Sequence, residues 1–255
     1  MSHNAIAFET IIRKEITRFL RIWPQTLMPS VITQTLYFVI FGKFIGSRIG
    51  DIDGISYMAF IVPGLVMMTV INSSFLNVVS SFFSSKFQRN VEELLVSPAA
   101  DWVIIAGYTV GGVLRGILVG ILVFGVSVFF THPVIYNGWV IAIFIFLTSV
   151  VFGLGGFMNA IFAHKFDDIS IFPTFVLTPL TYLGGVFYSI HHLPAFWQKV
   201  SMLNPILYMV NGFRYGFYGV SDVSVVGSIA MLVACAVLLA AGNMYIMKKG
   251  IGLKN

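Results

Sequence analysis

The sequence predicts an all-α membrane protein with six transmembrane helices, an N-terminal interfacial amphipathic helix and a re-entrant hairpin between spans five and six. Of the 255 residues, 58% are hydrophobic and only 10% are charged, whereas soluble domains carry about 25% charged residues. The mean hydropathy is +0.92. Apolar runs recur along the whole chain, and Pro and Gly interrupt the aromatic stretch before the last run. The length suits one membrane domain, residues 1–255, without a second soluble domain.

Residues 1–25 predict a helix that lies in the membrane interface. Apolar residues recur at steps of three and four: Phe8, Ile11, Ile12, Ile16, Phe19, Leu20 and Trp23. The opposite face is polar: Glu9, Arg13, Lys14, Thr17 and Arg21. A basic amphipathic helix of this kind lies flat at the level of the lipid headgroups. A helix that packs on a neighbour on the soluble side is the alternative. Pro24 is expected to break the chain before the first span.

Six segments are long and apolar enough to span a bilayer, which takes about 20 mostly apolar residues. They are residues 26–44, 58–80, 103–130, 139–162, 169–187 and 225–247. Several contain internal Pro or Gly. Neighbouring helices must satisfy the backbone groups that these residues free, so the predicted bundle is tightly packed.

The distribution of Lys and Arg predicts the orientation. Most of these residues lie in the N-terminal segment, in the loops after spans two and four, and at the C-terminus. The positive-inside rule therefore places both termini in the cytoplasm, and an even number of spans agrees with this. A seventh crossing by residues 203–220 would put the lysine-rich C-terminus outside. The basic residues lie between apolar runs, so membrane lipid and not nucleic acid is the expected partner for them.

The segment 188–208 is the predicted gate of a translocation pathway. It is too aromatic for a water-exposed loop and too interrupted by Pro and Gly for a spanning helix. Irregular backbone at membrane depth is tolerated only where protein buries it or a watery cavity lies beside it. The predicted gate residues are Tyr188, Pro194, Phe196, Trp197, Asn204 and Pro205.

Arg115 is the one charged residue expected deep inside a span. Counted from Val103, it lies about 18 Å along the helix at 1.5 Å per residue. An arginine at this depth costs about 3 kcal/mol or more unless it faces a wet cavity or a partner. It contacts either an anionic or polar part of a substrate in the pathway, or another helix as an internal clamp. The candidate partners are Asn72, Ser73, Ser74, Asn77 and the carbonyls around Gly111-Gly112.

Two loops on the predicted cytoplasmic side suit a protein partner. Charged and apolar residues alternate at helical spacing in residues 86–98, and Pro98 ends the pattern. A short amphipathic helix is therefore expected, which either docks into a partner's groove or rests on the membrane surface. The polar loop 164–168 is a second partner contact or a plain solvated loop. The candidate contact residues are Phe87, Arg89, Glu92, Glu93, Leu94, Lys165, Asp167 and Asp168.

The sequence lacks the signatures of an enzyme, so no catalytic and no metal-binding residues are predicted. It has no HExxH zinc motif and no GxSxG nucleophile motif. Gly42-Lys43 is followed by Phe44 instead of Ser or Thr, which excludes a P-loop. The predicted spans also contain no Asp or Glu, the usual carriers of proton coupling. A pump built from this chain must take its energy from another polypeptide.

Two stretches resemble the membrane permease subunits of ATP-binding-cassette exporters of the type-2 class. The first contains Gly184-Gly185-Val186-Phe187-Tyr188, residues 193–198, Leu203-Asn204-Pro205-Ile206 and Gly212-Phe213-Arg214. The second, from Arg89 to Pro98, is similar to that family's loop Glu-x-Leu-Leu-Val-x-Pro.

This resemblance implies a homodimeric permease in the inner membrane of a bacterium, driven by a separate ATPase subunit. That partner would bind ATP and Mg²⁺, and this chain would hold no cofactor. The loop with Glu92, Glu93 and Leu94 would be the coupling helix, and the region after Phe187 would be a re-entrant hairpin that closes the extracytoplasmic end. The family exports polysaccharides, lipid-linked glycans, drugs and other amphipathic molecules. The alternatives are a secondary transporter or channel independent of ATP, an intramembrane enzyme, and a membrane anchor.

Overall fold

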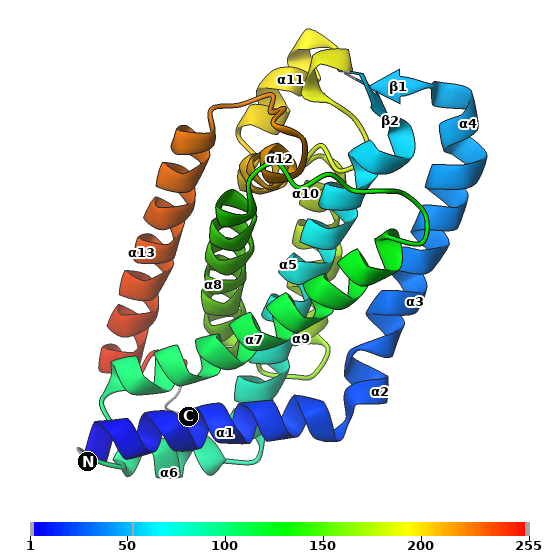
Figure 1. Cartoon of the computed structure of the whole chain (residues 1–255). Helices are drawn as coiled ribbons and strands as arrows, with labels where there is room; N and C mark the ends of the chain where they lie inside the picture. Colours follow the sequence, from blue (N-terminus) through cyan, green and yellow to red (C-terminus); the bar gives the residue numbers. More distant parts are fainter. Residues whose placement is uncertain (1–2, 53, 253–255) are drawn as a thin grey trace.

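Helices make up nearly all of the structure, a computed structural model that describes residues 3–52 and 54–252 (Figure 1). The longer helices are α1 (His3–Arg21), α5 (Tyr57–Phe87), α7 (Asp101–Ser127), α8 (Gly138–Phe162), α12 (Pro205–Tyr218) and α13 (Val225–Lys249). The shorter helices are α2 (Trp23–Thr26), α3 (Met28–Tyr37), α4 (Gly46–Ile49), α6 (Asn90–Val96), α9 (Asp168–Phe172), α10 (Thr178–Tyr182) and α11 (Ala195–Met202). Phe38–Ile45 and Pro173–Leu177 are π-helical, and Ile190–His192 is a 3₁₀ turn. The strands β1 (Asp51–Ile52) and β2 (Ile55–Ser56) form a small antiparallel hairpin that the sequence analysis did not predict.

Among the described residues, four helices are long and apolar enough to cross a membrane: α5, α7, α8 and α13. Their mean hydropathy over 18 residues runs from 1.8 to 2.5. The all-α membrane class is therefore confirmed, and these helices coincide with four of the predicted spans to within a few residues at most ends. The exception is α5, which continues past residue 80 to Phe87 because its last turns are still buried, with Ser81, Phe82 and Phe83 in the interior.

The predicted spans 26–44 and 169–187 are not single α-helices. Residue 26 ends α2, and α3 with a π-helical segment follows in the first of them. The second consists of α9, a π-helical segment and α10, and its helical structure ends at Tyr182. Pro29, Pro173 and Pro179 each stand at the first or second position of a segment, where the missing N–H is tolerated. Proline thus divides these runs into short pieces that follow one another.

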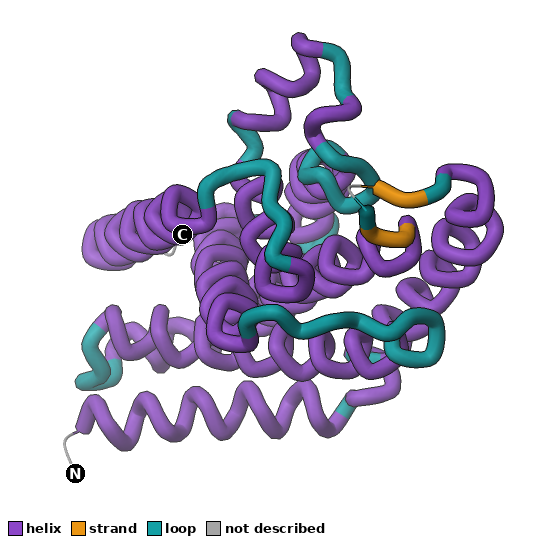
Figure 2. The backbone as a smooth tube through the Cα atoms, turned by 45° about the horizontal axis from the view of Figure 1, so that its top comes forward, coloured by secondary structure: helices purple, strands orange, loops and turns teal. Residues whose placement is uncertain are grey.

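The predicted interfacial helix corresponds to α1, which lies across the bundle beside α7 (Figure 2). Its buried residues are Ile11, Glu15 and Phe19. Two glycines of α7 make room for them: a Cβ on Gly107 would lie 2.7 Å from Ile11, and one on Gly111 would lie 2.6 Å from Glu15. The packing of α1 on a neighbouring helix therefore depends on small residues at a spacing of four.

Pro24 does not break the helical path as expected. It stands in the first turn of α2, and the chain changes direction two residues earlier, at Ile22, whose φ and ψ are −112° and 32°.

A buried carboxylate also attaches α1 to α5. Glu15 is fully buried and accepts a hydrogen bond from Arg18 Nη2 at 3.0 Å and from the hydroxyl of Ser81. The same Arg18 nitrogen donates to the carbonyl and to Oδ1 of Asn77, at 3.0 and 2.9 Å. Removing a partner from a buried charge typically costs 3–5 kcal/mol, so this cluster holds α1 firmly against the side of α5.

Helix α5 lies at the centre of the bundle and packs on α7, α8 and α12. Glycines again allow close approach. A Cβ on Gly112 of α7 would lie 2.9 Å from the Ser74 carbonyl oxygen, and one on Gly156 of α8 would lie 2.6 Å from that of Phe75. In membrane helices such small residues bring backbones together where no hydrophobic drive between helices exists.

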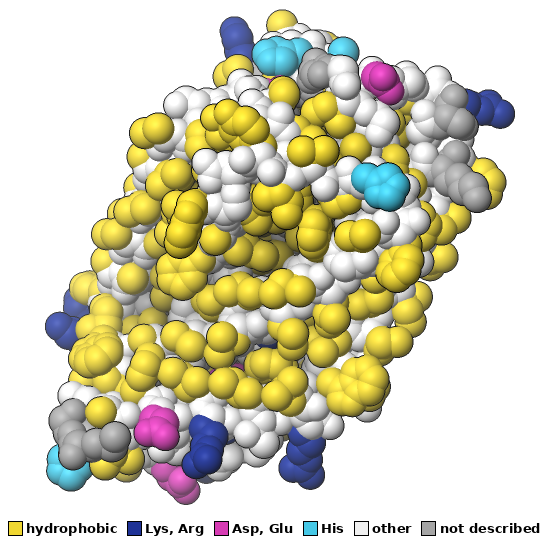
Figure 3. All heavy atoms as spheres, viewed as in Figure 1, with side chains coloured by type: hydrophobic (Ala, Val, Ile, Leu, Met, Phe, Trp, Pro, Cys, Tyr) yellow, Lys and Arg dark blue, Asp and Glu magenta, His cyan; other side chains and the backbone are white. Residues whose placement is uncertain are grey.

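On the face in Figure 3, most charged side chains lie toward the two ends, and apolar side chains cover the middle. Both termini, α1 and α6 are at one end, here called the α6 end (Figure 1). Helix α11 and the β-hairpin are at the opposite end, here called the α11 end (Figure 1). This separation suits a protein whose middle section is surrounded by lipid.

Gly156→Ala is expected to destabilise the protein by about 1–3 kcal/mol, because the added methyl group meets the backbone of α5 and cannot be accommodated by a side-chain movement. Thermal unfolding of the purified protein in detergent measures this. The neighbouring Gly155→Ala is the matched control, since its Cβ would find only Phe75 Cε2 at 4.0 Å. Equal melting temperatures for the two variants would contradict the close contact between α5 and α8.

Candidate functional site

The α6 end carries a groove of about 840 Å³, here called the α6 groove. The end of α5 supplies Phe83, Lys86 and Phe87, Arg89 follows, and α6 contributes four more residues. The complete lining is Phe83, Lys86, Phe87, Arg89, Val91, Glu92, Leu95, Val96, Ala163 and His164. Three of the predicted contact residues, Phe87, Arg89 and Glu92, therefore lie together in one concave surface.

A tight chain reversal positions α6 beside the end of α5. Arg89 adopts a left-handed backbone with φ of 62°, the one positive φ among the described non-glycine residues. Phe87 ends α5 and α6 starts only at Asn90, so the predicted amphipathic helix is shorter at its start than the 86–98 pattern suggested. Val91 faces the interior and is buried. The reversal leaves the other face of α6 open along the groove.

Lys86 joins α5 to the end of α8. Its Nζ donates to the carbonyl oxygens of Ile161 and Ala163, at 2.5 and 3.0 Å. These carbonyls belong to the last turn of α8 and its C-cap, where a positive charge also interacts favourably with the helix dipole. Lys86 thereby holds the end of α8 against the end of α5 at the α6 groove.

The loop 163–168 packs on the groove through an aromatic residue. The ring centroid of Phe166 lies 5.0 Å from that of Phe83 and 4.9 Å from that of Phe87, and both contacts are edge-on. The two loops that the sequence analysis selected separately thus form one surface. Lys165 and Asp167 are exposed on this loop.

Asp168 holds the shape of that loop. Its Oδ2 accepts hydrogen bonds from the backbone N–H groups of His164 and Lys165, at 2.8 and 2.9 Å. These donors favour the ionised carboxylate and lower the pKa of Asp168. Because the folded pKa is depressed, the contribution to loop order is complete above the ordinary aspartate pKa and is lost as the pH falls through the lowered value.

On α6, two of the candidate contact residues lie outside the groove lining, and several lining residues were missed. Leu94 packs against the core, and Glu93 is exposed outside the groove lining. The exposed apolar residues Leu95 and Val96, at 38% and 85%, take the place expected for Leu94. Their position could not be assigned from periodicity, because the rotation of α6 depends on where the turn at Arg89 directs it.

At the α11 end, the predicted gate residues lie on α11, at the start of α12 and in the turns before each helix. Pro194 precedes α11, and Phe196 and Trp197 on α11 are exposed, at 69% and 45%. Their rings meet edge-on at 5.5 Å. Tyr188, in the turn before them, is half-buried. The exposed rings make α11 an apolar projection at this end of the molecule.

Asn204 and Pro205 start α12 together. Asn204 Oδ1 accepts from the backbone N–H of Ile206 at 3.0 Å, and its Nδ2 donates to the Leu180 carbonyl at 2.6 Å. Pro205 fills the first helical position, where no N–H is needed. The cap therefore links the start of α12 to α10.

A buried polar network that the site predictions missed supports this region. Arg214 is 1% exposed, and its Nη2 donates to the carbonyl of Gly185 at 2.6 Å. Its guanidinium lies 3.8 Å from the ring centroid of Phe60 on α5, a close cation–π contact. Nη1 contacts Asn211 Oδ1 at 3.4 Å, and that oxygen also accepts from the N–H of Asp222 at 3.2 Å.

Asp222 extends the network to the 3₁₀ turn. Its carboxylate accepts from the Ser189 hydroxyl at 3.1 Å and from the Ile190 N–H at 3.1 Å, and His191 Nε2 lies 3.7 Å away. In the irregular stretch from Gly185 to Ile190, the Gly185 carbonyl and the Ile190 N–H are thus satisfied by side chains of α12 and the loop that follows. An apolar segment containing one arginine was the available sequence signal for Arg214. Its partner Gly185 is 29 residues away along the chain and Phe60 lies on α5, so the sequence alone did not show these contacts.

Arg115 is not part of either region. Its Nη2 donates to the carbonyl oxygen of Thr26 at 2.9 Å, at the junction of α2 and α3. The expected partners on α5 and the carbonyls around Gly111-Gly112 are not the acceptors of this hydrogen bond. The contact links α7 to the start of the first predicted span, as the clamp hypothesis requires, and the gate residues lie at the opposite end.

The family of the chain follows from a comparison with known proteins. Residues 6–218 match the family described as ABC-2 type transporter, which includes both the α6 groove and the gate region. The chain belongs to the ABC-2 type transporter family. It is therefore a permease of an ATP-binding-cassette transporter, and the alternatives of an ATP-independent carrier, an intramembrane enzyme and a plain anchor are set aside.

One relative of this ABC-2 permease covers nearly its full length, and another covers about four fifths of it. The inner membrane transport permease YadH of Escherichia coli K12 is 57% identical over 251 residues, 98% of both chains. The nodulation protein J of Neorhizobium galegae is 22% identical over 212 residues, 81% of this chain and 79% of the relative. Together with the apolar helices, the first relative identifies a multi-pass inner membrane protein.

Asp168→Ala is expected to increase amide exchange at residues 163–168, because two backbone N–H groups lose their acceptor. Hydrogen–deuterium exchange of the purified permease at neutral pH measures this. The control is Asp167→Ala, which leaves both hydrogen bonds in place. In the wild type, protection corrected for intrinsic exchange should decline only below the ordinary aspartate pKa of 3.8. Decline at higher pH, or equal exchange in both variants, would contradict the capping role.

Proposed function

We propose that two copies of this permease form a translocation pathway, and that a separate ATPase subunit drives each copy from the α6 groove. The observation that carries the proposal is the contact of α6, the end of α5 and the loop 163–168 in one concave surface. ATP and Mg²⁺ would be bound by the ATPase, since this chain has no P-loop. Family membership supports an ATP-binding partner.

The chemistry of the α6 groove suits a protein partner. Phe87, Phe166 and Val96 are exposed at 61%, 51% and 85%. Charged side chains of both signs surround them, including Arg89 and Glu92. Interfaces typically combine such an apolar centre with a polar rim. Glu93, Lys165 and Asp167 are exposed near this surface and would belong to its rim.

The same helix that ends at the groove begins beneath the gate region. Phe60 of α5 lies under Arg214, and Gly64 packs against the backbone of Val186, where an added Cβ would lie 2.8 Å from the carbonyl oxygen. In the proposed mechanism, closure of the ATPase pair displaces α6 and the end of α5. The displacement then reaches the turns before α11, and the segment 188–208 opens.

In the membrane, we place the α6 end and both termini in the cytoplasm. The consecutive segments α2–α4 and α9–α10 would complete six crossings, and α11 with α12 would form a re-entrant hairpin at the extracytoplasmic end. The apolar projection supports this placement, because Phe196, Trp197 and Leu203, the last 86% exposed, would otherwise face water. The burial of α12 among α5, α8 and α13 fits the need of a re-entrant helix for protein neighbours.

The proposed dimer contact lies along α3 and α9–α10. These segments expose large apolar side chains, among them Leu36 of α3 and Phe175 of the π-helical segment between α9 and α10, at 55% and 73%. They are adjacent, since the hydroxyl groups of Tyr37 and Tyr182 are 3.3 Å apart and the rings of Phe41 and Phe187 are 4.8 Å apart. Pairing of two copies here would place this aromatic cluster beside the pathway.

The double variant Glu92→Lys/Glu93→Lys tests the groove. Charge reversal on α6 should reduce copurification of the coexpressed ATPase at least tenfold, since like charges across an interface cost several kcal/mol. The control, Glu9→Lys/Asp51→Lys, makes the same change of net charge at exposed residues outside the groove. Full copurification and full transport-coupled ATPase activity in the groove variant would exclude this docking site.

Arg115→Leu tests the clamp. Loss of the hydrogen bond to Thr26 should destabilise the permease by about 1–3 kcal/mol, read as a lower melting temperature, and should weaken assembly with the ATPase. Arg115→Lys, which keeps a charged donor, should recover part of the loss. Unchanged melting and assembly combined with lost transport would instead assign Arg115 to the substrate.

A further inference from the structure

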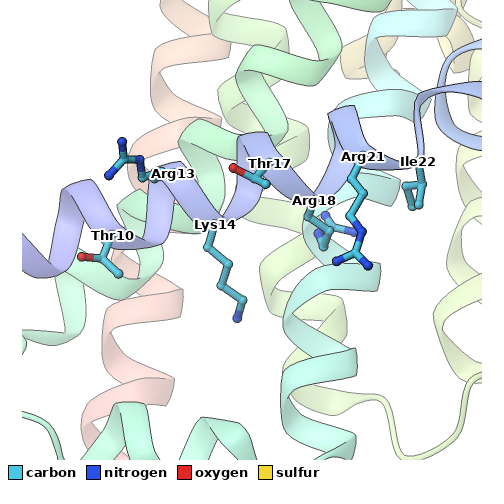
Figure 4. Close-up of a pocket in the computed structure, with 7 residues that line it drawn as sticks. All are labelled: Thr10, Arg13, Lys14, Thr17, Arg18, Arg21 and Ile22. Carbon is cyan, nitrogen blue, oxygen red and sulfur yellow. The ribbon is translucent and has the colours of Figure 1, made fainter.

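The outer face of α1 carries a second groove at the α6 end, separate from the α6 groove. It has a volume of about 700 Å³ and is here called the α1 groove. Its lining is Thr10, Arg13, Lys14, Thr17, Arg18, Arg21 and Ile22. Figure 4 shows these side chains along one stretch of the helix, with those of Lys14 and Arg21 extending to the same side. The spacing of three and four residues places them in one row.

The charge of this row is only partly balanced. Arg18 pairs with Glu15 at 3.0 Å, and Lys14 donates to the Ser85 hydroxyl at 3.3 Å. In the described part of the chain, neither Arg13 nor Arg21 forms an ion pair, and the groove lining contains no carboxylate. Both arginines are exposed. The groove is therefore a concave surface formed by the aliphatic stems of these side chains, with cationic head groups at its border that can donate to a phosphate.

The neighbouring surface of the same segment is apolar. Leu20, Ile22 and Trp23 are exposed at 47%, 39% and 51%. Exposed aromatic residues of this kind mark the headgroup level of a bilayer, where the ring is partly in hydrocarbon and partly in water. The cationic row is thus positioned where lipid phosphates lie, beside a surface that acyl chains can cover.

We propose that the α1 groove binds the phosphate headgroup of an anionic phospholipid from the adjacent membrane leaflet. Arg21 contacts the phosphate oxygens, and the acyl chains lie against Leu20 and Trp23. Arg13 lies about 12 Å away along the helix at 1.5 Å per residue and extends to the other side of α1, so it attracts the anionic headgroup without direct contact. A free phosphate would leave this apolar border without a function. An acidic protein surface fits less well, because an exposed Trp beside basic residues is typical of the headgroup level of a bilayer. The lipid site is independent of the ATPase docking proposed above.

The test compares lipid binding by native mass spectrometry of the purified permease in detergent. The probes are phosphatidylglycerol, phosphatidylcholine and inorganic phosphate. Phosphatidylglycerol should bind in preference to phosphatidylcholine, and inorganic phosphate should not displace it. Arg13→Gln/Arg21→Gln should reduce this preference about twenty-five-fold, since each basic residue near a membrane surface contributes roughly a factor of five. Both residues are exposed, so the variant should keep the wild-type melting temperature.

The matched control is Arg48→Gln/Lys199→Gln, which removes two exposed positive charges at the α11 end and should leave the preference unchanged. An equal loss in both variants would show a general charge effect and overturn the site. Displacement of the lipid by millimolar phosphate would assign the groove to a free anion. Loss of ATPase copurification with unchanged lipid binding would make the groove a protein contact, and either result would overturn the proposal.

Discussion

The continuity of α5 is the constraint on which the other parts of the molecule depend. This helix runs without interruption from Tyr57 to Phe87, about 46 Å at 1.5 Å per residue, and 83% of its most apolar window is buried. Its first turns support Arg214 and the turn at Val186, and its last turns form a wall of the α6 groove. Glycines of α7 and α8 bring neighbouring backbones into direct contact with it. Because closely packed interiors do not compress, a displacement at one end of such a helix must move what is packed at the other.

Internal partners for polar groups explain how irregular backbone is kept inside an apolar bundle. Glycine at position 185 has a positive φ of 72°, so the helix of α10 cannot continue through it. The guanidinium of Arg214 satisfies the carbonyl of that glycine, and Asp222 satisfies the N–H of Ile190. A charged residue in this position is costly unless it is fully paired. Here Asn211 and the face of Phe60 complete its surroundings, so the cost of the arginine is offset by the order that it imposes on the turns before α11.

The sequence predicted the features that depend on local composition and missed those that depend on tertiary contacts. Hydropathy located α5, α7, α8 and α13, because twenty apolar residues in a row have few alternatives to a spanning helix. Residues 26–44 and 169–187 are divided into α and π segments. This division depends on how the carbonyl freed by each proline is satisfied, and the sequence alone does not show that. Both loops of the α6 groove were selected for their charges. Their contact through Phe166, the inward rotation of Leu94, and the pairing of Arg115 with Thr26 all depend on segments distant in the sequence.

The two grooves at the α6 end act on the same segment of α5. Lys14 contacts Ser85, and Arg18 contacts Asn77, so α1 is attached to the last turns of this helix along one side. Lys86 and Phe83 attach the α6 groove to the same turns on another side. A lipid bound at the α1 groove would keep α1 at a constant depth in the membrane interface. An ATPase that displaces α6 would then move α5 relative to a stationary α1. The buried Glu15–Arg18 pair would transmit the force between these two helices. An interfacial helix without that lipid would instead be carried along with α5, and less of the displacement would reach the gate.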